Sequence, residues 1–159
     1  MPGKGIRPAG VIEEEAGAVW EKILVVDDDQ PMRELLAELL SNEGYEVVSA
    51  SNGPEAIRLA ALETPQLVIM DADMPGLDGV ETCWELRSQW DTCWVPVIMV
   101  TAFAEVRTEA LHAGVDDFLS KPFRPADLVA RVKALLKVRH VEDEIERALA
   151  YSRELRETL

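Results

Sequence analysis

The sequence has few cysteines, few basic residues and no long apolar run, and each scarcity argues against a class of protein. Its two cysteines among 159 residues, Cys83 and Cys93, have no companion Cys or His at a metal-ligand spacing. We therefore expect neither a zinc site nor a disulfide framework, and we interpret both as packing residues in a reducing cytoplasm. No segment approaches the roughly 18 apolar residues of a membrane span, and no secretory signal is present. A soluble, cytoplasmic protein without a membrane partner is expected.

Basic residues are outnumbered almost two to one. Sixteen Lys and Arg against thirty Asp and Glu give a net charge of −14. This charge argues against direct binding of nucleic acid or anionic lipid by this segment, and it favours a cation or a basic protein surface. An apolar fraction of 48% in 159 residues is sufficient for one globular domain with its own core.

The N-terminal residues 1–21 are predicted to be an extension that precedes the domain and is partly flexible. Glycine and proline are concentrated in residues 1–10, a composition that does not order itself by burial. Residues 11–21 combine acidic with apolar side chains. For them the sequence leaves two possibilities open, a short helix or a loose strap against the domain.

From residue 22 onward, short apolar runs rich in β-branched residues alternate with segments of helical periodicity. Pro31 opens one such helix, and Gly44 ends it. Five strand–helix repeats predict an α/β fold, a five-stranded parallel sheet with right-handed crossovers and helices on both faces. The expected strands cover residues 23–26, 45–50, 67–70, 94–100 and 117–120, and the expected helices about 31–42, 53–62, 78–90, 105–113 and 125–138.

One apolar run, residues 67–70, delivers a carboxylate to the point where its strand must stop. Asp71 follows this run, and Pro75 and Gly76 then terminate the extended segment. In open α/β sheets ligands gather at the carboxyl ends of the strands, so Asp71 is a candidate functional residue. The alternative is that Asp71 caps the next helix.

Three further strands end in polar or charged residues on the same predicted edge. Asp27 and Asp28 follow the first, Thr101 follows the fourth and Lys121 follows the fifth. Each has a structural alternative, namely a helix cap, a sheet hydroxyl or a solvated charge. Together, however, the carboxylates repel one another by about 4 kcal/mol per pair at ~4 Å in an effective dielectric near 20. The cluster therefore predicts a bound cation.

A hard divalent ion meets this requirement. Mg²⁺ binds one or two carboxylates, retains waters and completes its octahedron with phosphate oxygens. A carboxylate beside such an ion can accept a phosphoryl group as an aspartyl phosphate, while Lys121 neutralises charge on the transferring group. Thr101 is then expected to hydrogen-bond a phosphoryl oxygen.

Four motifs now support a resemblance. The runs Val-Val-Asp-Asp-Asp at 25–29, Asp-Ala-Asp-Met-Pro-Gly at 71–76, Thr-Ala at 101–102 and Lys-Pro-Phe at 121–123 resemble those of the receiver domain of two-component response regulators. The resemblance covers about residues 22–138. It implies a flavodoxin-like sheet of order 2-1-3-4-5, and a signalling role rather than that of an enzyme.

The resemblance also implies roles for individual residues. Asp71 is the phosphoacceptor, and the donor is a sensor histidine kinase or a histidine phosphotransfer protein. Phe118 is the switch aromatic that moves with Thr101. The implied oxygen ligands of Mg²⁺ are those of Asp28 and Asp71, the backbone carbonyl of Asp73 and, through water, Asp27.

Other functions were weighed against this one. Asp71-Ala72-Asp73 also matches the Asp-x-Asp signature of haloacid-dehalogenase-type phosphatases, but Pro75 stands where that pattern continues with Thr or Val. His140 could be a phosphorelay histidine, although the residues after it do not follow the pattern of kinase phosphoacceptor helices. We interpret His140 and His112 as surface residues. Trp84, Trp90 and Trp94 are interpreted as core and rim packing. For Trp90 and Trp94, a contact patch is the alternative.

Two positions are predicted to tune the lifetime of the phosphoryl group. Asp73 lies two residues after the acceptor, and Phe103 lies two residues after Thr101, so both flank the approach of the attacking water. Phe103 is large and apolar and is expected to obstruct that water. Asp73 could either orient the water or repel its hydroxide-like form. A long-lived phosphoryl group is the expected result.

Residues 139–159 are predicted to be a helical linker or coiled coil. Apolar and small residues recur there at alternating spacings of three and four, which is a heptad seam. We expect a homodimer held by residues 138–159 and by the face of the fourth helix and fifth strand, whereas the alternative is a helix folded back on its own domain. No glycine or proline stop precedes Leu159, so a stand-alone receiver and a piece of a longer protein both stay open. The seam consists of Val138, Val141, Ile145, Ala148, Ser152, Leu155 and Leu159.

Overall fold

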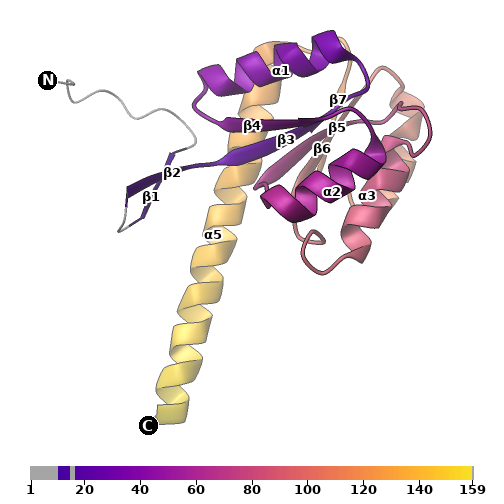
Figure 1. The fold of residues 1–159 in the computed structure, drawn as a ribbon. Coiled ribbons are helices and arrows are strands. Elements are labelled where there is room, and N and C mark those ends of the chain that lie inside the picture. The colour runs from indigo at the N-terminus through magenta and orange to yellow at the C-terminus, as the bar shows by residue number, and fades with distance from the viewer. Residues whose placement is uncertain (1–10, 15–16, 159) are drawn as a thin grey trace, which may run out of the picture.

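Within the residues that the structure describes, 11–14 and 17–158, five parallel strands form the central sheet of this computed structural model (Figure 1). The strand order is β4-β3-β5-β6-β7. Counted along the chain from β3, this order is 2-1-3-4-5, so the predicted flavodoxin-like topology is confirmed. The strands are β3 (Lys22–Val26), β4 (Glu46–Ala50), β5 (Leu67–Asp71), β6 (Val97–Thr101) and β7 (Asp117–Ser120).

Helices cover both faces of this sheet (Figure 1). One face packs against α1 and α5, and the other against α2, α3 and α4. The expected helix at 105–113 is divided into a short 3₁₀ turn, η1, followed by α4. The helical elements are α1 (Gln30–Asn42), α2 (Gly53–Glu63), α3 (Gly79–Ser88), η1 (Ala104–Val106), α4 (Arg107–His112) and α5 (Pro125–Thr158).

Alternating strand residues divide the interior into two apolar cores. Successive side chains of a strand point to opposite faces of the sheet. In β3, Leu24 and Val26 therefore pack toward α2 and α3, whereas Ile23 and Val25 pack toward α1 and α5. All five residues of β5 are buried, including Asp71 at its carboxyl end. The continuous apolar runs thus reflect strands that are covered on both faces.

Local capping explains where α1 begins and ends. The Asp29 side chain accepts a hydrogen bond from the Met32 backbone N–H at 3.2 Å, and Pro31 occupies the first turn. Gly44, whose φ of 94° is accessible chiefly to glycine, follows the C-cap. Asp29 rather than Asp27 or Asp28 is therefore the cap of this helix.

The N-terminal extension contains a hairpin instead of a helix. Strands β1 (Val11–Glu14) and β2 (Gly17–Trp20) pair antiparallel. The helical alternative for residues 11–21 is therefore wrong, because the backbone groups of the two strands pair with each other. The predicted flexible tail, residues 1–10, lies outside the described residues.

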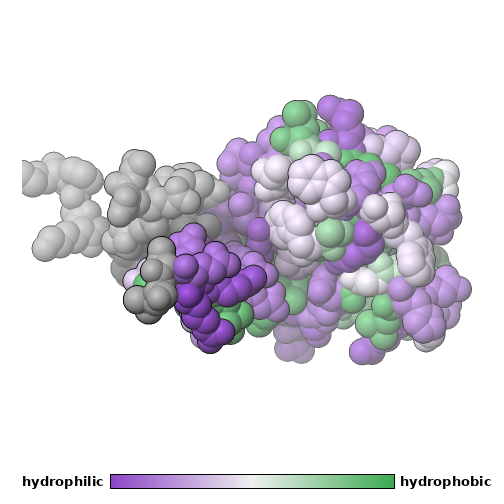
Figure 2. All heavy atoms as spheres, turned by 90° about the horizontal axis from the view of Figure 1, so that it is seen from below, coloured by the Kyte–Doolittle hydropathy of each residue, from purple (hydrophilic) through white to green (hydrophobic). Residues whose placement is uncertain are grey.

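Helix α5 continues without interruption from the sheet into the C-terminal extension, which projects away from the domain (Figure 1). No bend at residue 138 returns it to the sheet, so the fold-back alternative is wrong. Val138, Val141 and Ile145 are 55%, 47% and 54% exposed. Seen from below, the molecular surface is mainly hydrophilic, with isolated hydrophobic residues between (Figure 2). Among the described residues, no helix is both long and apolar enough to span a membrane.

Helix α3 and its connection to β6 correct three predictions. The strand begins at Val97 instead of residue 94. Cys83 is buried and its Sγ contacts the Ala113 carbonyl at 3.3 Å, as a packing residue should, but Cys93 is exposed. Core packing is also wrong for the tryptophans, because a large part of each side chain remains accessible, whereas Trp94 does pack at the rim, against Arg139. The exposed fractions are 54% for Trp84, 88% for Trp90 and 44% for Trp94.

Candidate functional site

Three carboxylates meet at the carboxyl edge of the sheet. Asp27 and Asp28 follow β3, and Asp71 is the last residue of the neighbouring strand β5. One oxygen from each lies within 4.8 Å of the other two. Asp27 and Asp71 are buried, at 2% and 7% exposure, and Asp28 is exposed. The parallel register therefore brings together the acidic residues that the sequence predicts to meet.

Lys121 supplies the opposite charge from the end of β7. Its Nζ lies 3.2 Å from Asp27 Oδ2 and 3.6 Å from Asp71 Oδ2. Its backbone N–H donates to the Thr101 carbonyl at 2.7 Å, which fixes the loop that carries it. One ammonium thus faces two buried carboxylates, so the site keeps an excess of negative charge.

The pKa of Asp71 is raised from 3.8 to about 6 in this setting. Burial of the carboxylate is the largest cause, and the neighbouring charge of Asp27 is the second. A hydrogen bond from the Asp73 backbone N–H, at 3.2 Å to Oδ1, and the charge of Lys121 act in the opposite direction. Asp71 is consequently ionised at neutral pH, although its surroundings disfavour the charged form.

The hydroxyl of Thr101 is fully buried beside this cluster. Its Oγ1 accepts a hydrogen bond from the Phe103 backbone N–H at 3.2 Å. The Phe103 side chain is 45% exposed, and Phe118 is half-buried against the core that covers the α2 and α3 face. The Asp73 side chain is exposed and is not part of the carboxylate cluster.

Several neighbours of the site were missed by sequence reasoning. The Asp29 backbone N–H donates to Asp27 Oδ1 at 2.9 Å, and Arg33 Nη1 donates to the Asp27 carbonyl at 2.7 Å. Both contacts hold Asp27 in place. A Cβ added at Gly79 would collide with the backbone carbonyl of Asp71, so glycine allows α3 to begin against the acceptor. An Asp-Gly pair at the start of a helix was the only local signal of this contact.

The structural alternatives for the site residues and histidines can now be judged. Asp78, whose side chain accepts from the Glu81 backbone N–H at 2.8 Å, is the cap of α3, so Asp71 is not a helix cap. His112 is exposed, as expected of a surface residue. His140 is partly buried, and its Nε2 lies 3.4 Å from Glu21 Oε2.

An apolar cleft of about 380 Å³ adjoins the site. Lys121 lines this cleft and also pairs with Asp27 and Asp71, so the two places share one residue. The residues that line it come from α1, from the loops that follow β6 and β7, and from the start of α5. They are Met32, Leu35, Leu36, Leu39, Ala102, Lys121, Pro122, Phe123 and Pro125.

Residues 23–133 match the family described as the response regulator receiver domain. The chain therefore belongs to the receiver-domain family of two-component response regulators, which are signalling proteins, and the haloacid-dehalogenase alternative is not supported. The chain is 48% identical over 119 residues to the probable transcriptional regulator ycf27 of Porphyra purpurea, covering 74% of this chain and 48% of that protein. The chain thus spans about half the length of the curated relatives it matches.

Solved structures show the same relationship. The chemotaxis protein CheY4 of Vibrio cholerae is 30% identical with a TM-score of 0.70, covering 74% of this chain and 99% of that one. The receiver domain of the sensor histidine kinase PA1611 from Pseudomonas aeruginosa is 31% identical with a TM-score of 0.69, covering 74% and 98%. The latter was solved with a magnesium ion coordinated in its active-site cleft.

Proposed function

We propose that this chain accepts a phosphoryl group on Asp71 from a sensor histidine kinase or a histidine phosphotransfer protein. The observation that carries the proposal is the placement of the Asp71 carboxylate, buried at a strand end, between two further carboxylates and the Lys121 ammonium. An Asp71 oxygen attacks phosphorus, the N–P bond of the donor breaks, and the imidazole departs with the electron pair. Lys121 balances the charge on the transferring group.

The donor set supports a magnesium site. Its ligands are hard oxygens, and the ion pairs that their carboxylates form among the described residues are those of Asp27 and Asp71 with Lys121. The carboxylates of Asp28 and Asp71 and the backbone carbonyl of Asp73 hold the ion, and Asp27 contributes through water. When bound, Mg²⁺ supplies positive charge to the phosphoryl oxygens. The magnesium in the related PA1611 domain supports the same assignment.

The apolar cleft beside Lys121 is suited to the donor. Its walls come from one face of α1 and the loop after β7, and Leu35 in this wall is 53% exposed. A donor helix that packs its apolar side here brings its phosphohistidine toward Asp71. The exposed Leu35 therefore has a use outside the core.

Phosphorylation is proposed to act through Thr101 and Phe118. A phosphoryl oxygen on Asp71 accepts a hydrogen bond from the Thr101 hydroxyl, whose Oγ1 already accepts one from the Phe103 backbone N–H, and the new bond draws Thr101 toward Asp71. Movement of Thr101 makes room for the half-buried Phe118 on the adjacent strand β7 to turn inward. This change alters the face formed by α4, β7 and α5, which can then bias assembly.

The α5 extension is proposed to form a parallel coiled coil with a second copy of the chain. At about 100° per residue, Val138, Val141 and Ile145 lie on the side of the helix roughly opposite the buried Leu136. The seam therefore points away from the domain and is accessible to a twin. Opposite charges can also pair across a parallel dimer, because Lys137 and Glu142 occupy g and e positions of this heptad.

Phosphorylation is tested by incubating the protein with acetyl phosphate and Mg²⁺ and measuring intact mass. We expect one acid-stable, base-labile phosphate, which Asp71→Asn abolishes and EDTA prevents. Glu105→Gln, an exposed neighbour outside the site, serves as the matched control and should label normally. Retained labelling of Asp71→Asn would contradict the proposal.

Assembly is tested by light scattering with and without beryllofluoride. We expect a dimer that tightens with beryllofluoride and is lost on truncation after Lys137. If the protein is a monomer at ~100 μM under both conditions, its dimer Kd is too weak for a stable pair. That result would contradict the coiled coil but not the phosphoacceptor role.

A further inference from the structure

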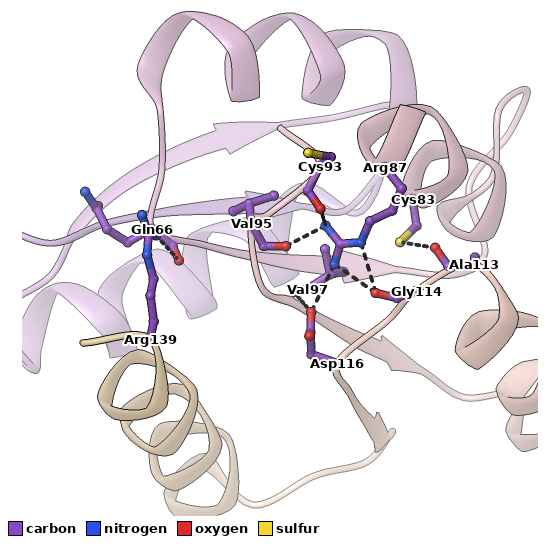
Figure 3. Close-up of polar contacts among 10 residues, drawn as sticks. All are labelled: Gln66, Cys83, Arg87, Cys93, Val95, Val97, Ala113, Gly114, Asp116 and Arg139. Carbon is purple, nitrogen blue, oxygen red and sulfur yellow. Dashed lines mark hydrogen bonds and ion pairs between the residues drawn. The ribbon is translucent and has the colours of Figure 1, made fainter. Parts of the chain in front are cut away.

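Arg139 joins the root of the α5 extension to the amino ends of two central strands. Its Nη1 donates to the Gln66 carbonyl at 3.0 Å, and Gln66 immediately precedes β5 (Figure 3). Its guanidinium carbon lies 3.7 Å from the centroid of the Trp94 ring, and Trp94 lies just before β6. These strands end at Asp71 and Thr101. One side chain on α5 thus contacts the far ends of the strands that carry the proposed acceptor and switch residues.

Hydrogen bonds within its own loop fix the Trp94 ring against which this guanidinium packs. Arg87 Nη1 donates to the carbonyls of Cys93 and Val95 at 3.2 and 2.7 Å (Figure 3). The indole N–H of Trp94 donates to the Asp91 carbonyl at 3.0 Å. The loop therefore offers a fixed aromatic face on which a planar guanidinium can stack.

On the other flank of the helix, the neighbouring residue His140 lies close to a buried carboxylate. His140 Nε2 lies 3.4 Å from Glu21 Oε2, and the Glu21 side chain is only 9% exposed. Residues 139 and 140 differ by about 100° around the helix, and Leu136 projects between them. Contacts on both flanks of one buried residue resist rotation of α5 about its own axis.

The Arg139 contacts have to outweigh an unfavourable environment. Burial of the guanidinium lowers the pKa of Arg139, while the charges of Asp143 and Glu21 act in the opposite direction. Fixing a long, flexible side chain also loses rotamer entropy. The ring of Trp94 and the carbonyl of Gln66 stabilise the Arg139 guanidinium in this partly buried position.

We propose that Arg139 is a positioning residue that sets the rotation of the α5 extension relative to β5 and β6. In this setting Val138, Val141 and Ile145 face away from the domain. The regulatory part rests on the function proposed above. Because both strands are extended and hydrogen-bonded on both edges, a displacement at their carboxyl ends is passed to the Arg139 junction and turns the seam.

The junction itself is tested by distances between two spin labels. In a Cys93→Ser background, labels are attached through Arg58→Cys on α2 and Arg153→Cys on the extension, and excess unlabelled protein suppresses distances between copies. We expect one narrow distance distribution that Arg139→Ala and Trp94→Ala broaden. Trp94→Phe, which keeps an aromatic face, should restore it, and Trp90→Ala on the same loop should leave it narrow. A distribution that stays narrow in Arg139→Ala, or is broad in the parent, overturns the proposal.

Coupling is tested in the same variants by the beryllofluoride-induced change in dimer Kd. In the parent we expect beryllofluoride to tighten the dimer on the order of tenfold. In Arg139→Ala and Trp94→Ala this tightening should fall below about twofold, and in Trp94→Phe it should match the parent. Labelling of Asp71 by acetyl phosphate should be equal in all of them, which excludes a merely damaged fold. Full tightening in Arg139→Ala overturns the coupling. If the parent protein is neither phosphorylated by acetyl phosphate nor dimeric, the proposed function is contradicted. The distance distributions test the Arg139 junction independently of that result.

Discussion

The two ends of strands β5 and β6 differ in how well their polar groups are satisfied. At the carboxyl ends, three carboxylates cluster and one ammonium pairs with two of them, and the pKa of Asp71 is raised to about 6. At the amino ends, one side chain, Arg87, donates to the carbonyls of Cys93, Val95 and Gly114 and to the carboxylate of Asp116, which also accepts from the Val97 N–H (Figure 3). The carboxyl end, where negative charge is in excess, is where a ligand can act. The amino end, whose polar groups are satisfied, contributes stability.

The largest effect is expected at the satisfied end. Arg87→Met keeps much of the side-chain volume but leaves several inward-facing carbonyl oxygens without a donor. We expect a loss of about 3 kcal/mol in the free energy of unfolding, measured by urea denaturation. The exposed Arg58→Met is the matched control and should change stability by less than about 0.5 kcal/mol. A similar small change in Arg87→Met would remove the contrast between the two ends.

A smaller effect of opposite sign is expected at the acidic end. Because the pKa of Asp71 is raised from 3.8 to about 6, protonated Asp71 favours folding below pH 4, and this contribution is lost as pH rises through 6. Asp71→Asn should therefore stabilise the metal-free protein at pH 7.5 and not at pH 4. The upper limit of about 3 kcal/mol is reduced by solvent screening to the order of 1 kcal/mol.

Thermal melting in EDTA at the two pH values measures this gain. Glu105→Gln controls for the loss of any surface carboxylate. Adding Mg²⁺ should shrink the advantage of Asp71→Asn, since the ion binds the parent more tightly. An Asn variant that is less stable than the parent at pH 7.5 would show that the cluster is not electrostatically strained.

The smallest effect concerns the lifetime of the phosphoryl group. Phe103 is half exposed next to Thr101, where it can obstruct the water that attacks the aspartyl phosphate. Phe103→Ala should speed dephosphorylation several-fold, followed as loss of labelled mass after removal of acetyl phosphate. The exposed Glu105→Ala on η1 should leave the rate unchanged. An unchanged or slower rate in Phe103→Ala would refute the shielding.

What the sequence predicts well is what local pattern encodes. Apolar runs that end in Asp27, Asp71 and Thr101 locate the strands and, through parallel pairing, the site. Contacts across long sequence separations left no such pattern. Arg87 donates to carbonyls that carry no sequence signature, and Gly79 matters only because the Asp71 backbone approaches it. Bulky Trp90 was assigned to packing by its chemistry, although its loop leaves it outside the core.

The helical boundary at residue 138 shows a different limit. The sequence was divided there because the apolar pattern changes its role, from covering the sheet to forming a seam. The backbone has no reason to stop, since neither glycine nor proline interrupts α5 (Pro125–Thr158). Leu159, the last residue of the predicted seam, lies outside the described residues.

The central claim is that Asp71, and no other carboxylate of the cluster, carries the phosphoryl group. Reduction of the acetyl phosphate-treated protein with borohydride converts an aspartyl phosphate to homoserine, which peptide mass spectrometry locates. We expect homoserine at position 71 alone, and only in samples that were treated in the presence of Mg²⁺. Homoserine at position 27, 28 or 73 in its place, or phosphate on His140, would contradict it.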